Sequence, residues 1–109
     1  MNLLATCYVT GYIWGMIASF NHKGLELFFV KGDGSKLPAQ YLRKIRQLLS
    51  VLHAAQTLRD INLPGYDLHS LKGDLKGFWA VKVSANYRII FQFIEAKIEV
   101  VDVDYTDYH

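Results

Sequence analysis

Residues 78–94, FWAVKVSANYRIIFQFI, carry the pattern that decides the fold. In the first half, Trp79, Val81 and Val83 alternate with smaller or charged residues, which is the period of a strand with one buried face. The second half is a run of β-branched and aromatic residues, which also favours a strand. Because only the short Ala85-Asn86 connection separates the two halves, we expect an antiparallel hairpin.

The register of this hairpin has two alternatives. A two-residue turn opposes Arg88 to Val83, and a three-residue turn opposes Arg88 to Ser84. Only the three-residue turn places Arg88 on the same sheet face as Lys82. The residue pattern is compatible with either register.

Strands are also expected on both sides of the hairpin. Residues 66–71 precede it and residues 97–105 follow it, each across a short connection. In the second of these strands, Val101, Val103 and Tyr105 alternate with charged neighbours and are predicted to share a face. Consecutive antiparallel hairpins are the simplest topology for these strands.

Two helices are expected before the strands. Between His22 and Val30 the apolar residues recur at i, i+3 and i+4, and between Pro38 and Ala55 four aliphatic residues form a longer stripe. The stripe consists of Leu42, Ile45, Leu49 and Leu52, with Arg43, Lys44 and Arg46 on or beside the opposite face. The predicted fold class is therefore α+β, with two N-terminal helices packed on a mainly antiparallel sheet in two layers.

Residues 1–15 precede this pattern and carry no charge. They lack the basic n-region and the cleavage site of a signal peptide, and polar residues interrupt a span that needs about 20 apolar residues. Three alternatives stay open for this segment: an extension without a role, an added strand or a weak membrane anchor. We expect residues 16–109 to form one domain, for which Met16 is a sensible start.

The composition of the 109 residues is that of a globular chain, with 51% hydrophobic and 20% charged residues. The single cysteine, Cys7, excludes an internal disulfide and a cysteine-rich metal framework, and it favours a reducing, cytoplasmic setting. Residues 23–88 contain eleven Lys and Arg against five Asp and Glu, a balance of +6, whereas residues 89–109 have a balance of −4. A basic segment of this size can attract a polyanion such as RNA, or it can be an ordinary solvated surface.

Known cofactor motifs are missing from the sequence. It has no Walker loop, dinucleotide-binding glycine pattern, H-E-x-x-H or G-x-S-x-G, and its four histidines lack metal-ligand spacing, so we expect neither a cofactor nor a metal. The strand half instead collects imidazole, ammonium, guanidinium, phenol and carboxylate groups: His69, Lys72, Lys76, Lys82, Arg88, Asp107, Tyr108 and His109. These groups suit metal-free RNA cleavage, in which a 2′-hydroxyl loses a proton, the phosphate gains charge and the 5′-oxygen is protonated.

Several motifs of the strand half occur together. They are Leu68-His69-Ser70-Leu71-Lys72-Gly73, Gly77-Phe78-Trp79, Asn86-Tyr87-Arg88-Ile89 and the closing Asp107-Tyr108-His109. In this combination the chain resembles the HigB-like killer toxins of the RelE/ParE superfamily, from Met16 to the last residue. The resemblance implies a RelE-like fold and a toxin of a type II toxin–antitoxin pair, which enters the ribosomal A site and cleaves mRNA there without a metal.

The same resemblance implies roles for the motif residues. His69 and His109 are acid/base candidates whose order stays open, Asp107 would orient or polarise a histidine, and Tyr108 would stack on or bond a nucleotide. Because His109 ends the sequence, its own α-carboxylate should favour the imidazolium form.

The resemblance also implies that several cationic residues bind the RNA. Arg88, counted among the catalytic residues, would hold the phosphate at the cleaved bond. The RNA-binding candidates are Lys72, beside that phosphate, with Lys76 and Lys82, and Arg43, Lys44 and Arg46 toward ribosomal RNA. The chain departs from the family at Ser84, where many relatives have an arginine, and Lys82 is a candidate substitute. A second departure is Tyr87 in place of the commoner tryptophan.

The resemblance also implies partners. These are a small HigA-like helix-turn-helix antitoxin, the 30S A site of the ribosome with its mRNA, and operator DNA bound through the antitoxin, with no membrane. Two alternatives stay open: a ParE-like toxin that binds a topoisomerase without being a nuclease, and an inactive relative that keeps only its antitoxin. His69, Lys72 and the D-Y-H tail argue against the first alternative, whereas Ser84 keeps the second open.

Overall fold

The computed structural model describes residues 16–107 of the chain. Its helices are α1 (Lys23–Lys31) and α2 (Leu42–Ala54), with short 3-10 turns at η2 (Ala39–Tyr41), η3 (Leu58–Asp60) and η4 (Gly73–Leu75). Its strands are β1 (Met16–Ile17), β2 (His69–Ser70), β3 (Trp79–Lys82), β4 (Tyr87–Ile94) and β5 (Glu99–Asp107). The expectations for residues 1–15, Tyr108 and His109 lie outside the described residues.

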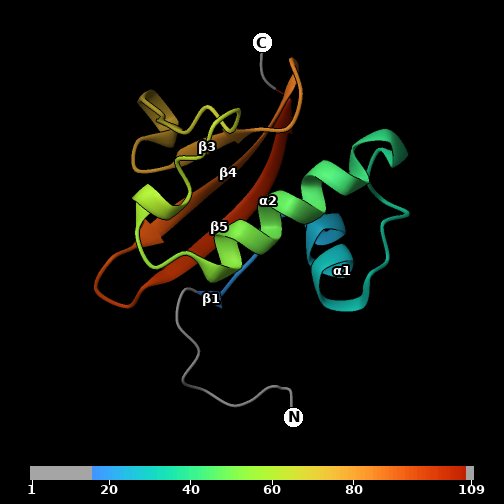
Figure 1. The fold of residues 1–109 in the computed structure, drawn as a ribbon, viewed down its shortest axis with the longest axis horizontal. Coiled ribbons are helices and arrows are strands. Elements are labelled where there is room, and N and C mark those ends of the chain that lie inside the picture. The colour runs from blue at the N-terminus through green and yellow to red at the C-terminus, as the bar shows by residue number, and fades with distance from the viewer. Residues whose placement is uncertain (1–15, 108–109) are drawn as a thin grey trace.

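The five strands form one sheet in the order β1-β5-β4-β3-β2. Strands β2 to β5 run antiparallel to their neighbours, and the two-residue β1 pairs parallel with β5 at one edge. Figure 1 shows α2 crossing in front of the sheet with α1 beside it, so the helices form one layer and the sheet the other. The predicted two-layer α+β class is confirmed, and the helices follow β1.

The core lies between the helices and one face of the sheet. The predicted stripe of α2 forms its centre, since Ile45, Leu49 and Leu52 are at most 1% exposed, while Leu42 at the helix start is only partly buried. The sheet residues that meet this stripe are Val81, Val83, Ile89, Phe91, Val100 and Val103. Removal of this apolar surface from water is the main contribution that favours the fold.

Local hydrogen bonds close both ends of α1. The Nδ1 atom of His22 accepts the backbone N–H of Leu25 at 3.2 Å, which satisfies one of the donors that a helix start leaves unpaired. At the other end, Gly32 has a φ of 73°, in the left-handed region that favours glycine, and its N–H donates to the Phe28 carbonyl at 2.9 Å. The helix predicted over residues 22–30 is confirmed with a displacement of one residue.

Strand β5 contains a bulge that the sequence pattern does not reveal. The pairs Ile90↔Asp104 and Gln92↔Val101 leave one more residue on β5 than on β4, and Asp102 has a φ of 56°. Because of this extra residue, Val100 and Val103 both turn into the core. The prediction that Val101, Val103 and Tyr105 share a simple alternating face is therefore wrong at Val101.

The β3–β4 hairpin has a register that neither alternative described. Lys82, the last residue of β3, lies directly opposite Arg88, and residues 83–86 connect the two strands. The N–H groups of Val83 and Ser84 both donate to the Tyr87 carbonyl, at 3.0 and 3.2 Å, which closes this loop. Both expected registers are thus wrong, but Arg88 and Lys82 share a sheet face, as the three-residue turn required.

Candidate active site on the open face of the sheet

The face of the sheet turned away from the helices, here called the open face, has buried residues of its own. Val81 and Ile89 point into the helix-side core, so their neighbours Ala80 and Ile90 point to the open face, yet Ala80 is 0% and Ile90 only 5% exposed. The chain between β2 and β3 covers them. Beneath it lies a cleft of about 230 Å³, lined by Leu71, Lys72, Leu75, Ala80, Arg88, Ile90, Thr106 and Asp107.

Two glycines shape the β2–β3 connection that walls the cleft. Gly73 has a φ of 69° and Gly77 a φ of 100°, one at the start of η4 and one after its end. A Cβ at Gly73 would meet nothing within 4 Å, so lack of space does not explain the glycine. Its left-handed backbone conformation does, because glycine adopts it without strain. The two ends of the connection are held together by the Leu71 N–H, which donates to the Phe78 carbonyl at 2.9 Å.

Arg88 is the central charged group of the cleft. It is only 7% exposed, and its Nη1 donates to the carbonyls of Ser84 at 2.6 Å and Tyr87 at 3.1 Å. A buried guanidinium needs such acceptors, because its desolvation is otherwise costly. Ser84, the residue that departs from the family pattern, therefore contributes through its backbone carbonyl.

Tyr87, the other departure, anchors the same hairpin from the opposite side. Successive residues of a strand point to opposite faces, so Tyr87 points to the helix side and Arg88 to the cleft. The Tyr87 ring stacks on Tyr105, with centroids 5.3 Å apart and planes at 11°, and lies 6.1 Å from the Tyr41 ring. Burial, aided by the neighbouring tyrosines, raises the pKa of Tyr105 to about 12, so that phenol stays neutral.

His69 stands on the open face at the edge of the sheet. In the pairing of β2 with β3 it is opposite Ala80, which in turn is opposite Ile90. Its Nδ1 lies 2.8 Å from the carbonyl oxygen of Asp67, which only accepts, so Nδ1 donates the hydrogen of this bond. Asp67 has a φ of 52° and breaks the strand predicted over residues 66–71, of which β2 is the remaining part.

The end of β5 supplies two residues to the cleft. Arg88 is opposite Thr106, and Tyr87 is opposite Asp107, so Thr106 shares the open face directly with Arg88. Asp107 also lines the cleft, at the end of the strand. Sequence reasoning missed Thr106, because only the β4–β5 register shows that it faces Arg88. Tyr108 and His109 lie outside the described residues.

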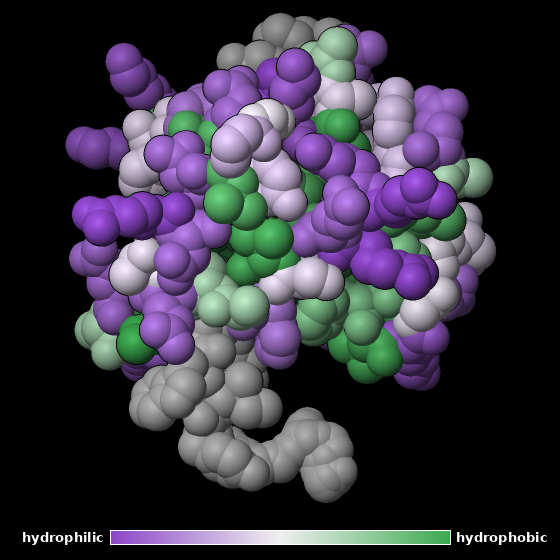
Figure 2. All heavy atoms as spheres, viewed as in Figure 1, coloured by the Kyte–Doolittle hydropathy of each residue, from purple (hydrophilic) through white to green (hydrophobic). Residues whose placement is uncertain are grey.

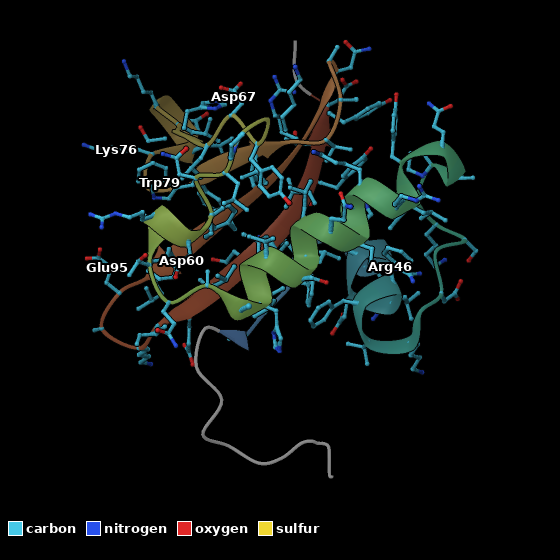
Figure 3. The ribbon with its side chains drawn as sticks, in the orientation of Figure 1. Arg46, Asp60, Asp67, Lys76, Trp79 and Glu95 are labelled. Atoms are coloured by element: carbon cyan, nitrogen blue, oxygen red, sulfur yellow. The ribbon has the colours of Figure 1, made fainter. Side chains whose placement is uncertain are left out.

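The predicted lysines divide into two groups. Lys72 lines the cleft, and Lys82 is exposed on the open face opposite Arg88. Lys76, which follows η4, is exposed and is not among the residues that line the cleft. Figure 3 shows its side chain pointing outward from the β2–β3 connection. The structure thus brings Lys72 and Lys82 toward Arg88 but does not bring Lys76 to the cleft.

The three cations of α2 do not form one patch. Lys44 lies over the ring of Tyr66, with its Nζ 4.7 Å from the centroid, and Arg46 lies over the ring of Phe28 at 5.1 Å. The two side chains leave opposite flanks of the helix, with the exposed Arg43 between them. Figure 3 shows Arg46 where α2 passes α1, and Figure 2 shows that this side of the molecule is mostly hydrophilic around a central hydrophobic strip. These cations lie on the helix layer, whereas the cleft is on the open face.

Other properties of residues 16–107 bear on what the chain can bind. Within that range, no helix is long and apolar enough to cross a membrane. No group of three or more His, Cys, Asp or Glu in the same range is placed to hold a metal ion.

The comparison with known families identifies this chain as a small RelE-like toxin. The model of the HigB-like toxins, described as the RelE-like toxin of type II toxin–antitoxin system HigB, matches residues 18–109. This chain belongs to that family of HigB-like toxins.

Individual relatives agree with this assignment. The chain is 45% identical over 94 residues to the Endoribonuclease HigB of Proteus vulgaris, covering 86% of this chain and 100% of the relative. It is 33% identical over 82 residues to Toxin HigB-1 of Vibrio cholerae serotype O1, covering 73% of this chain and 86% of the relative. A YoeB/ParE toxin from Agrobacterium tumefaciens has the same fold, with a TM-score of 0.53 at 17% identity over 86% of this chain and 98% of that one.

Proposed function

We propose that this toxin is an endoribonuclease that cleaves mRNA in the A site of the ribosome, with the RNA's own 2′-hydroxyl as nucleophile and without a metal. The carrying observation is the cleft, in which a buried guanidinium, fixed by two carbonyls, lines the same hollow as Lys72. The relative that bears the name endoribonuclease supports the reaction class.

The scissile phosphate is held by Arg88 and Lys72. Two hydrogen bonds from Nη1 to turn carbonyls fix the position of the Arg88 guanidinium beside the cleft, where its positive charge can bind a phosphate. As the 2′-oxygen attacks phosphorus, negative charge grows on the phosphoryl oxygens, and preorganised cations stabilise it most at that stage.

The proton transfers are assigned to His69 and His109, in an order that remains open. One imidazole takes the proton of the 2′-hydroxyl as the new P–O bond forms, and the other gives a proton to the departing 5′-oxygen. The contact of Nδ1 with the Asp67 carbonyl fixes the orientation of the His69 ring on the open face. Asp107 orients or polarises a histidine, and Tyr108 stacks on or bonds a nucleotide.

Cations outside the cleft bind RNA away from the phosphate that is cleaved. Lys82 extends the positive charge next to Arg88 across the hairpin, and Lys76 extends it beyond the β2–β3 connection. Arg43, Lys44 and Arg46 on the helix layer contact ribosomal RNA while the open face receives the message. Their contribution falls as salt rises, as for other phosphate contacts.

A toxin of a type II pair has an antitoxin as partner, and we infer that this one is a HigA-like helix-turn-helix protein. The pair binds its own operator DNA through the antitoxin. The toxin itself acts in the cytoplasm.

The test is cleavage of a programmed mRNA by the purified protein with its native C-terminus, with and without 70S ribosomes. Free RNA is assayed in EDTA. Arg88→Ala is the inactive variant, and Arg59→Ala, which removes an exposed arginine on η3, is the matched control. We expect cuts in A-site codons that need ribosomes and disappear only in Arg88→Ala. A folded protein that binds ribosomes without cleaving mRNA would indicate an inactive relative. A folded protein that does not bind ribosomes would indicate a topoisomerase-binding toxin.

A further inference from the structure

Three tyrosines pack against each other on the helix side of the sheet, behind the cleft. Tyr87 and Tyr105 are stacked, with ring centroids 5.3 Å apart and planes at 11°, and the ring of Tyr41 lies 6.1 Å from that of Tyr87. Because Ile89 is opposite Tyr105, the two stacked tyrosines are diagonal neighbours on one face, a separation that aromatic side chains can bridge. A stacked pair at this distance is favourable beyond the apolar area that it buries.

The backbone of each stacked tyrosine leads directly to the cleft. The Tyr87 carbonyl accepts two N–H groups of the loop over residues 83–86, at 3.0 and 3.2 Å, and the Nη1 of Arg88 at 3.1 Å. One oxygen atom thus holds both the loop and the guanidinium. Tyr105 precedes Thr106, which lies opposite Arg88 on the open face. A displaced tyrosine therefore displaces a residue that borders the cleft.

The end of β5 depends on side-chain packing, because only β4 pairs with it there. In the described part of the chain, β1 and Phe20 pair with β5 as far as Val103 and no further. Beyond that point, the Tyr105 N–H donates to the side chain of Asp104 at 2.8 Å and not to a neighbouring strand. On this side Tyr105 is instead contacted by the ring of His22, 5.9 Å away at 74°.

The ring of Tyr105, and not its hydroxyl, makes these contacts. The hydroxyl oxygen is buried, and within residues 16–107 it has no hydrogen-bond partner. A buried hydroxyl without a partner is unfavourable, so it does not explain why a tyrosine stands here. A phenylalanine would keep the stack, whereas a leucine would remove it.

We propose that the stack of Tyr87 and Tyr105 positions Arg88 and the end of β5 for mRNA cleavage, from the opposite face of the sheet. Both tyrosines are positioning residues, since they do not line the cleft and act through the adjoining backbone of Arg88 and Thr106. A misplacement of about 1 Å at a reacting group can lower a rate about 100-fold. This inference rests on the proposed function, because the step that the stack supports is RNA cleavage.

The activity test uses three variants and measures kcat and KM for mRNA on programmed ribosomes. Tyr105→Leu removes the ring from the stack, and Tyr105→Phe keeps it. Phe93→Leu is the matched control, because Phe93 is a half-buried aromatic residue on the same face of β4, at the end away from Arg88.

We expect Tyr105→Leu to lower kcat about tenfold or more while KM changes less than about twofold, since the geometry of the reacting groups is altered and not the affinity for the ribosome. Tyr105→Phe should restore kcat, and Phe93→Leu should keep it although the core is weakened. Full kcat in Tyr105→Leu, no rescue by Tyr105→Phe, or an equal loss in Phe93→Leu overturns the proposal.

The side chain of Arg88 is also observed directly, without ribosomes or cleavage, by NMR of protein labelled with ¹⁵N-arginine. The two bonds of Nη1 restrict rotation of the guanidinium, so we expect resolved Nη signals, assigned by their loss in Arg88→Lys. Tyr105→Leu should shift or broaden these signals, whereas Tyr105→Phe and Phe93→Leu should leave them in place. Unchanged Arg88 signals in Tyr105→Leu overturn the proposal.

The two proposals fail differently in these measurements. If the wild-type protein does not cleave mRNA but its Arg88 signals depend on the ring at position 105, the nuclease is rejected and the stack remains the support of Arg88. If the wild-type protein cleaves mRNA and Tyr105→Leu changes neither kcat nor the Arg88 signals, the nuclease stands and the positioning role is rejected.

Discussion

Arg88 on β4 and Thr106 on β5 lie directly opposite each other on the open face of the sheet. On its other side Arg88 is opposite Lys82 of β3, so the guanidinium stands between an ammonium and a hydroxyl in one row. Asp107, which the sequence motif emphasises, is opposite Tyr87 and lines the cleft from the strand end. The surroundings of Arg88 are thus set by register more than by nearness in sequence.

Arg88→Lys should lower cleavage about 100- to 1,000-fold, the usual effect of removing one preorganised donor to a charged transition state. An ammonium is a point donor and cannot hold the Ser84 and Tyr87 carbonyls and a phosphate in one plane. Single-turnover cleavage of ribosome-bound mRNA measures the loss, with Arg59→Lys as the exposed control. Full activity of Arg88→Lys would contradict the assigned role.

His53 should make the fold less stable at acidic pH. Its Nδ1 accepts the backbone N–H of Ile17 at 3.2 Å, and partial burial lowers its pKa below the ordinary 6.5. The unfolded chain therefore binds the proton more readily than the folded protein. The contribution of His53 to stability is complete above pH 6.5, and it is lost as the pH falls toward the lower pKa of the folded state. Protonation also removes the acceptor that holds β1 to α2.

Urea unfolding at about pH 7.5 and about pH 5 measures this dependence. The control is His53→Asn, whose side-chain oxygen can accept the same N–H but does not titrate. Other groups titrate equally in both proteins, so the difference between them isolates His53. An identical pH dependence in the two proteins would reject the prediction.

Leu52→Ala should destabilise the protein by about 2–5 kcal/mol, because it leaves a cavity at the centre of the core. Leu52 is 0% exposed on the predicted stripe of α2. Val30→Ala is the contrasting variant: Val30 is 66% exposed, and its loss should change stability by less than about 0.5 kcal/mol. Chemical denaturation checks both, and similar losses for the two variants would contradict the described packing.

Gly73→Ala should cost about 1–2 kcal/mol, because its φ of 69° is left-handed and unfavourable for a residue with a Cβ. Gly73→Asn should cost less, since asparagine tolerates this region. The two variants also test the wall of the cleft: in Gly73→Ala the KM for mRNA should rise more than kcat falls, because the connection carries Leu71, Lys72 and Leu75. Equal stability of Ala and Asn variants would show that the conformation does not matter.

Much of the fold is readable from periodicity. The stripe of α2 and the extent of β4 follow from local patterns, because each repeats over many residues and buries one continuous face. The bulge at Asp102 is not readable, since a single added residue leaves the composition of a strand unchanged while it reverses which side chains face the core.

The site was only partly predictable, for a related reason. The motifs point to His69, Lys72, Arg88 and Asp107, and the structure places Lys72, Arg88 and Asp107 at one cleft with His69 on the same face. Thr106 and the apolar floor at Ala80 carry no chemical signature of their own, so only cross-strand pairing reveals them. Likewise, no rule of spacing shows that Lys44 and Arg46 rest on aromatic rings on opposite flanks of α2.

The bond from Arg88 to the carbonyl of Ser84 has an evolutionary consequence. A carbonyl is present in every residue type, so point mutations at position 84 can accumulate without removing the acceptor that positions the guanidinium. Insertions and deletions are different, because a change in the length of the loop over residues 83–86 moves the carbonyl itself. The side chain at this position can therefore change, as Ser84 in place of the commoner arginine illustrates, whereas the length of the loop should vary little among homologues.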